Sequence, residues 1–136
     1  MKLLMIYMDV FKYKPTIKTL EGYPDYTDEV ERNNVLAAFI QMEKEDEENR
    51  KYAETKLVKN LKWAAKKNAT KHIILHSFAH LSESKASPEI TKEFFDSVEE
   101  RLKNTGYDVE QTPFGYFLDL EVKAPGKSSA RIFKSF

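Results

Sequence analysis

The sequence predicts an α/β or α+β domain in which a mixed β-sheet packs against two main helices. Residues 2–9 and 35–42 are near-continuous apolar runs, which are typical of strands buried on both faces. Residues 51–67 and 88–105 carry apolar side chains every three or four positions, the spacing of an amphipathic helix. Strand-like runs lie between and after these segments, and no internal repeat is present.

The first half of the chain is expected to supply two central strands, over residues 2–9 and 35–42. Residues 10–19 alternate apolar and polar side chains, as a strand does. Pro15 cannot donate a backbone hydrogen bond, so we expect this segment to be an edge strand or a hairpin partner. A Gly- and Pro-containing acidic stretch up to Glu31 reads as a loop. The charge block 43–48 is expected to form a solvated turn.

The second half of the chain alternates helices and short strands. After the helix over 51–67, the β-branched run 72–76 predicts a third strand. Ser87 before Pro88 is an N-cap followed by proline at the first helical position, so the second helix starts there and stops at Gly106. We expect the remaining strands at residues 107–109, 116–122 and 130–133.

Composition excludes several classes of protein. A chain of 136 residues with 41% hydrophobic and 32% charged residues is sufficient for one domain with a core, over residues 1–136. The absence of cysteine excludes a disulfide framework, a thiol nucleophile and a cysteine-based zinc site. The apolar runs are too short to span a membrane, and no signal-peptide cleavage site follows the first residues. We therefore expect a cytoplasmic protein without membrane contact.

Charge gives no sign of a dedicated nucleic-acid module, because 22 Lys and Arg residues balance 22 Asp and Glu residues. Lysines interleave with Trp63 on the 51–67 helix, and they could face RNA, but a solvated helix face is the favoured explanation. Any contact with RNA is expected to be local or to depend on another part of a larger assembly.

Three histidines recur every four residues, at His72, His76 and His80. On a helix this spacing would suggest zinc or copper, but the residues between the first two are strand-like, so a metal site is disfavoured. His80 lies beyond the end of that strand, where open α/β sheets bind their ligands, or else it is an ordinary loop histidine.

Motifs for nucleophilic catalysis and phosphate binding are absent. Ser77 or Ser82 could pair with a histidine on paper, but there is no Gly-x-Ser-x-Gly elbow, and no Walker or Gly-x-Gly-x-x-Gly loop. The aromatic segment 114–117 could floor a pocket or pack in the core. The residues alone therefore predict a pocket between the 77–82 loop and the 114–117 segment.

Four sequence segments carry a family resemblance over nearly the whole chain. They are Met1–Ile6 leading to Asp9, Val35–Ile40 with Glu43-Lys44, Ser77-Phe78-Ala79-His80-Leu81-Ser82, and Pro113-Phe114-Gly115-Tyr116. In this order they resemble the N-terminal editing domain of archaeal threonyl-tRNA synthetases. The resemblance implies a D-aminoacyl-tRNA deacylase-like fold, a homodimer, and removal of serine from L-seryl-tRNA(Thr). It also implies that the domain belongs to a longer synthetase chain, which supplies most of the grip on tRNA(Thr).

The resemblance also implies a site, without metal or other cofactor. Around the seryl group it would place Met42, Ser77, Phe78 and Ala79, with the main chain of Ala79 taking part in the chemistry. His80 would lie beside the ester, and the terminal adenosine would be surrounded by Phe114, Gly115, Tyr116 and Phe117. In this family, backbone groups and the 2′-hydroxyl of the RNA are thought to activate the hydrolytic water.

Two departures from the family pattern bear on the chemistry. Leu118 stands where the family often has lysine, and Arg131 stands near the C-terminus where it often has an acid. Substrate-assisted hydrolysis would tolerate the missing lysine, whereas side-chain acid–base catalysis would not. Two alternatives stay open, a free-standing D-aminoacyl-tRNA deacylase and a non-catalytic module that binds tRNA ends or an amino acid.

Overall fold

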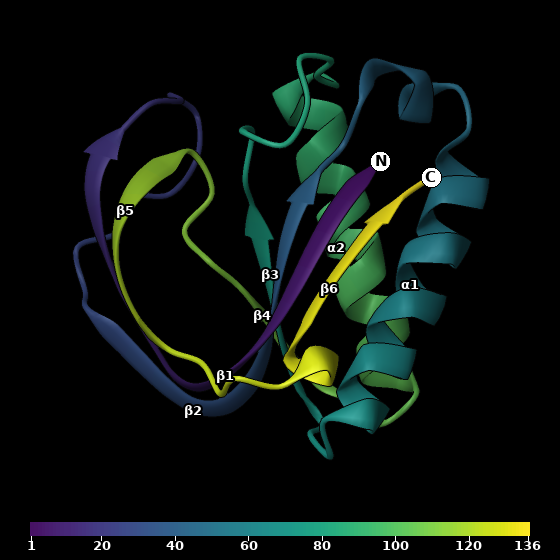
Figure 1. The fold of residues 1–136 in the computed structure, drawn as a ribbon. Coiled ribbons are helices and arrows are strands. Elements are labelled where there is room, and N and C mark those ends of the chain that lie inside the picture. Colours follow the sequence, from purple (N-terminus) through teal and green to yellow (C-terminus); the bar gives the residue numbers. More distant parts are fainter.

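Six strands form one mixed sheet, and two long helices cover one of its faces (Figure 1). The computed structural model describes all residues, 1–136. The elements are β1 (Lys2–Lys18), β2 (Val30–Gln41), the short 3-10 helix η1 (Lys44–Glu47), α1 (Arg50–Lys67), β3 (His72–Ser77), α2 (Pro88–Asn104), β4 (Asp108–Gln111), β5 (Tyr116–Lys123), the short 3-10 helix η2 (Ser128–Ala130) and β6 (Arg131–Ser135). The prediction of a mixed sheet with two main helices is confirmed.

The strands are ordered β4-β3-β2-β1-β5, and β6 pairs with the first half of β1. β2, β3 and β4 run parallel to one another, whereas β1 runs antiparallel to β2, β5 and β6. Each parallel connection contains one of the two helices, as parallel pairing requires a long crossover. β3 lies between β4 and β2, and its carboxyl end is beside the carboxyl end of β2 because the two strands are parallel.

β1 corrects one prediction, because residues 10–19 do not fold back on residues 2–9 as a hairpin partner or separate edge strand. A single strand runs from Lys2 to Lys18 and bends with β2 and β5 into a curled half of the sheet (Figure 1). Pairing with β2 ends at Tyr13, so Pro15 lies where β1 has β5 as its only neighbour. A proline without an N–H is tolerated at such a position.

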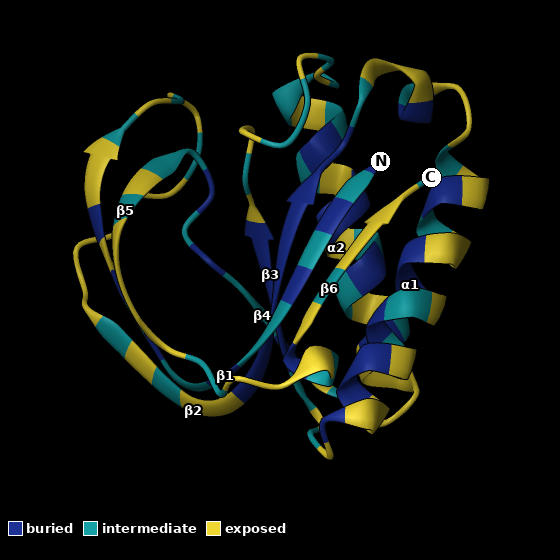
Figure 2. Ribbon diagram, in the orientation of Figure 1, coloured by how far each residue is buried: buried dark blue, intermediate teal, exposed yellow.

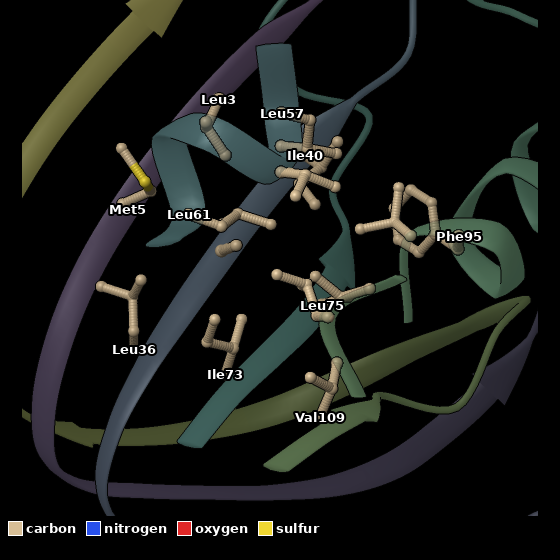
Figure 3. Close-up of a cluster of buried hydrophobic side chains, with 14 of the residues drawn as sticks. Leu3, Met5, Leu36, Ile40, Leu57, Leu61, Ile73, Leu75, Phe95 and Val109 are labelled. Atoms are coloured by element: carbon tan, nitrogen blue, oxygen red, sulfur yellow. The ribbon is translucent and has the colours of Figure 1, made fainter. Parts of the chain in front are cut away.

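Two hydrophobic clusters pack on opposite faces of the sheet. The larger joins β1, β2 and β3 to the helices, for example through Leu36, Leu61 and Phe95 (Figure 3). The smaller fills the concave side of the curl and includes Phe11 and Phe39, which are buried. Figure 2 shows the consequence, because β2 is dark over its C-terminal half and β3 along its central segment. The prediction of a strand buried on both faces is confirmed for residues 35–41, and β2 begins earlier, at Val30, within the stretch predicted to be a loop.

Local signals place α2 where they predict it. The hydroxyl of Ser87 accepts a hydrogen bond from the Ile90 N–H at 3.3 Å, and Pro88 occupies the first turn. The strands predicted at 72–76 and 116–122 are also present, as β3 and β5, and the final strand β6 covers Arg131–Ser135.

The charge block 43–48 is more than a solvated turn. Glu43 accepts a hydrogen bond from the N-terminal amine at 2.5 Å, and the buried Asp46 lies 2.9 Å from the same amine. Burial opposes ionisation of Glu43, but hydrogen bonds from the amine and from Ser82 hold its pKa below the usual range. The start of β1, the end of β2 and the loop after β3 are thereby tied together.

Candidate functional site

Two adjoining cavities open beyond the carboxyl end of β3. The larger has a volume of about 320 Å³ and lies between residues 76–80 and 113–118. The smaller, of about 150 Å³, lies between the end of β2 and the start of α2. Five residues line both cavities and mark their junction, namely Leu20, Ser77, Ala79, Lys85 and Phe114. The predicted pocket between the 77–82 loop and the 114–117 segment is present.

The structure brings all the predicted site residues to these cavities. The larger one is lined by Ser77, Phe78, Ala79, His80, Phe114, Gly115, Tyr116 and Phe117. Met42 lines the smaller one and is buried, since it also belongs to the main core. Segments that are separated by more than thirty residues in the chain thus meet at one edge of the sheet.

Gln41 fixes the first wall of the site, the loop after β3. Its amide oxygen accepts the N–H groups of Leu81 and Ser82, both at 2.7 Å. Its amide nitrogen donates to the carbonyls of Ser82 at 2.7 Å and Ser84 at 2.9 Å. Because the side chain is only 3% exposed, these four hydrogen bonds satisfy it almost entirely within the protein. The loop that carries Ala79 and His80 is therefore anchored on β2.

Gly115 fixes the second wall, the turn that leads into β5. Its φ of +83° suits glycine, and a Cβ at this position would lie 3.0 Å from the Cβ of Leu20. The Gly115 carbonyl accepts hydrogen bonds from the backbone N–H of Thr19 at 2.7 Å and from its hydroxyl at 3.0 Å. Close approach at Gly115 thus holds the aromatic segment against the end of β1.

The aromatic residues of this wall differ in how far they are exposed and in what they contact. Phe114 is 8% exposed and packs edge-on against Tyr23 and Phe95, with ring centroids 5.0 and 6.5 Å away. The Tyr116 hydroxyl accepts the N–H of Tyr26 at 3.1 Å. Phe117 is 52% exposed on the rim of the larger cavity, so its ring face is accessible for stacking.

The three histidines have separate environments. His76 is buried, and its Nδ1 lies 2.8 Å from the hydroxyl of Thr112. Burial, together with the nearby His80, lowers the pKa of His76 to about 4, so its ring is neutral at physiological pH. His72 pairs with Glu110 at 2.6 Å, whereas His80 is exposed and packs edge-on against Phe78 at a centroid distance of 4.9 Å. No group of three or more His, Asp or Glu side chains is arranged to hold a metal ion.

The site offers hydrogen-bond donors rather than an activated nucleophile. The Ser82 hydroxyl donates to Glu43 and accepts from the N–H of Ser84, and neither it nor the Ser77 hydroxyl bonds a histidine. The backbone N–H groups of Ala79 and His80 have no acceptor within the protein. Two free amides at the mouth of a cavity can bind a carbonyl oxygen, an oxyanion or a water molecule.

Several other residues bear on the site. Leu118 lines the larger cavity, so a lysine at that position would reach it. Arg131 lines neither cavity and donates to the Pro125 carbonyl at 2.7 Å. Trp63 is 46% exposed between Lys67 and Lys134, but no residue of α1 lines either cavity. Neither helix is long and apolar enough to cross a bilayer.

Sequence reasoning missed Leu20, Gln41 and Lys85. Leu20 follows β1 in a segment read as a loop, and Gln41 sits inside an apolar run where one amide carries no signal. Lys85 is one of many surface lysines. Only the assembled fold brings these residues to the cavities.

A comparison with solved structures identifies the fold. The fold matches that of a solved structure titled c-Myc DNA Unwinding Element Binding Protein, with a TM-score of 0.68, 13% identity, and coverage of 100% of this chain and 99% of that one. The molecule therefore has the D-aminoacyl-tRNA deacylase-like fold that the family resemblance implies.

Similarity in sequence identifies the family to which the chain belongs. The chain is 33% identical to the threonine–tRNA ligase of Thermococcus gammatolerans, over 99% of this chain and 22% of the relative. It is 34% identical to that of Methanosphaera stadtmanae, over 93% of this chain and 21% of the relative. A family model described as the Archaea-specific editing domain of threonyl-tRNA synthetase matches residues 1–136. The chain belongs to this family, and it spans about a fifth of the length of these relatives.

Proposed function

We propose that this domain hydrolyses the ester of L-seryl-tRNA(Thr), and so removes serine that has been attached to the wrong tRNA. One observation carries the proposal: a small cavity adjoins a larger aromatic-walled cavity, with the free amide of Ala79 at their junction and that of His80 beside it in the larger cavity. An amino acid esterified to a nucleoside has this shape, a small group joined to a larger planar one.

The two cavities support a position for each half of the proposed substrate. The seryl group occupies the smaller cavity, beside Met42 and the main chain of Ser77 and Ala79, and Phe78 lies between these two residues in the wall of the larger cavity. The terminal adenosine occupies the larger cavity, where Phe117 on the rim can stack on the base and Tyr116 lines the wall. The ester bond then lies at the junction, with His80 on the adenosine side.

The reaction needs water as its only co-reactant. The water oxygen adds to the seryl carbonyl carbon, and the bond from this carbon to the ribose 3′-oxygen then breaks. One water proton passes to the 3′-oxygen, and the other leaves as free serine ionises to the carboxylate. The Ala79 and His80 N–H groups stabilise charge on the carbonyl oxygen, and the neighbouring 2′-hydroxyl of the RNA orients the water.

Serine is the expected substrate because the aminoacylation site of a threonyl-tRNA synthetase alone discriminates poorly between serine and threonine. Serine lacks one methyl group of threonine, and such a difference supplies about 1–3 kcal/mol of selectivity in a binding pocket, or about 10–200-fold. A second site that destroys the wrong ester supplies the remaining accuracy, provided that the small cavity rejects the threonine methyl.

Partners follow from the same proposal. The domain acts in the cytoplasm, as a homodimer, on the 3′ end of tRNA(Thr) delivered by the remainder of a threonyl-tRNA synthetase. The relatives support this arrangement, since the matching region is about a fifth of a threonine–tRNA ligase. A formal net charge of zero is compatible with it, because the domain needs to receive only the end of the tRNA.

A deacylation assay tests the proposal. The chain is mixed with tRNA(Thr) carrying L-serine, L-threonine or a D-amino acid, and release of the amino acid is followed over time with and without EDTA. We expect rapid release of L-serine, slow release of L-threonine and no effect of EDTA. Preferential release of the D-amino acid would instead identify a D-aminoacyl-tRNA deacylase.

Leu118 favours a second candidate, a non-catalytic module that binds the aminoacylated tRNA end. The leucine lines the larger cavity at the position where the family resemblance implies a lysine, so the cation expected there is absent. In this case the chain would bind seryl-tRNA(Thr) in a filter or gel-shift assay but would release no serine above the uncatalysed rate.

A further inference from the structure

We infer that Lys85 supplies a cation that stabilises the reacting ester. This inference rests on the proposed function and adds a catalytic residue to it. The observation behind it is a juxtaposition: Lys85, from the segment between β3 and α2, lines both cavities at their junction.

Position distinguishes Lys85 from every other charged residue. Of the five residues shared by the two cavities, four are Leu20, Ser77, Ala79 and Phe114, and Lys85 is the only one that carries a charge. It is also the only Lys, Arg, Asp or Glu residue that lines either cavity. His80 also lies near the proposed ester position, but it lines only the larger cavity and not the smaller one.

The backbone on both sides of Lys85 is fixed. The Ser84 carbonyl accepts a hydrogen bond from Gln41, and the Ser84 hydroxyl accepts the N–H of Lys44 at 3.0 Å. On the other side, the N–H of Ala86 donates to the carbonyl of Met42 at 2.9 Å. A lysine between two anchored residues presents its side chain from a defined origin, which limits the entropy lost when it binds substrate.

The ammonium group of Lys85 is also free to act. It forms no ion pair or hydrogen bond with the protein, although many surface lysines of this chain do. It is exposed, so its charge carries no large desolvation cost in the free protein. A bound substrate would exclude part of the water and strengthen its attraction for negative charge.

The chemistry assigns it a single role. When water adds to the seryl carbonyl carbon, the carbonyl oxygen becomes negatively charged, and the Lys85 ammonium donates a hydrogen bond to it alongside the Ala79 and His80 amides. Lysine neither gains nor loses a proton in this role, and the bond changes are those of the hydrolysis described above. The interaction strengthens as charge develops, so it raises kcat more than it lowers KM.

Three variants test the assignment with L-seryl-tRNA(Thr) as substrate. Lys85→Met keeps the length of the side chain and removes its charge, and we expect kcat to fall by about 10²–10³-fold with little change in KM. Lys85→Arg keeps the charge and should retain activity within about tenfold of the wild type. Lys59→Met on α1 removes an exposed lysine that lines neither cavity, so it should leave both constants unchanged.

The outcomes separate the two proposals. A wild-type kcat in Lys85→Met overturns the role of Lys85 and leaves the editing function standing. A raised KM with unchanged kcat also overturns it, because that pattern means uniform binding of the tRNA. If the wild-type chain releases no serine, the proposed function fails first, and the role of Lys85 falls with it. Unfolding curves for each variant exclude loss of the fold as the cause.

Discussion

His76 and His80 show how burial separates two residues of the same type. Both line the larger cavity, but His76 is buried against Phe39 and bonded to Thr112, whereas His80 is exposed beyond the strand end. The neutral ring of His76 shapes the cavity floor, and His80 remains accessible to a substrate. The sequence predicts that the two differ, because only His80 lies outside the strand.

His76 predicts a pH dependence of stability. Its pKa is about 4 in the folded protein and about 6.5 in the unfolded chain, so between these values protons bind preferentially to the unfolded state. The neutral His76 ring contributes its full share to the free energy of unfolding above pH 6.5. This contribution is lost as the pH falls from 6.5 through 4, and the loss is on the order of 3 kcal/mol in total. Urea unfolding at pH 7 and pH 4 measures this loss.

A pair of variants isolates the contribution of His76. His76→Asn removes the titrating group, so the difference in stability between pH 7 and pH 4 should shrink by about the amount assigned to it. His80→Asn removes an exposed histidine and should keep most of the wild-type pH dependence. Equal pH dependence in wild type and His76→Asn would show that the buried ring does not resist protonation.

Ala79 predicts a loss of activity without a loss of the fold. Its side chain lies at the junction of the two cavities and is exposed, so Ala79→Phe fills the junction without entering the core. We expect serine release to fall below detection while circular dichroism and the unfolding midpoint stay near wild type. Ala124→Phe, in the turn before η2, is a control that should keep full activity. Full activity in Ala79→Phe would place the site elsewhere.

Elements defined by local signals were predictable, and elements defined by tertiary contacts were less so. α2 follows from Ser87, Pro88 and its apolar spacing, all of which act within a few residues. The continuous β1 was not predictable, because Pro15 normally ends a ladder and is tolerated here only because β2 has already diverged. The strand bend depends on partners far away in the chain.

Gln41 links an element to the site, and its replacement should loosen the loop after β3. Gln41→Met removes four hydrogen bonds from a buried side chain and leaves the loop groups unpaired, at a cost of about 2–4 kcal/mol. We expect faster amide exchange at Leu81 and Ser82 and a lower urea midpoint. Gln111→Met removes hydrogen bonds to the exposed Asp96 and the partly buried Glu99 and should cost less than about 1 kcal/mol. Unchanged exchange at Leu81 would contradict the anchoring role.

At the scale of the whole molecule, the site is a product of topology. The sequence predicts two of its walls, because the 77–82 and 114–117 segments follow or open recognisable strands. It does not predict the junction, since Leu20, Lys85 and Phe114 come from three remote parts of the chain and meet only when the sheet curls. A single lysine among 22 basic residues has no sequence pattern that marks it.

The complete complex with tRNA decides whether the RNA or the protein activates the water. The site contains no cysteine and no serine–histidine pair, so His80 is the remaining candidate for a general base. A positioned general base contributes about 10²–10⁴-fold to a rate, and a residue that only lines the site contributes less.

We expect replacement of the terminal 2′-hydroxyl by hydrogen to slow serine release by more than His80→Ala does. Single-turnover rates of the 2′-deoxy substrate with wild type, and of the normal substrate with His80→Ala, make the comparison directly. Filter binding of both substrates separates a chemical effect from a loss of affinity. Normal turnover of the 2′-deoxy substrate together with an inert His80→Ala variant would identify His80 as the base and exclude assistance by the RNA.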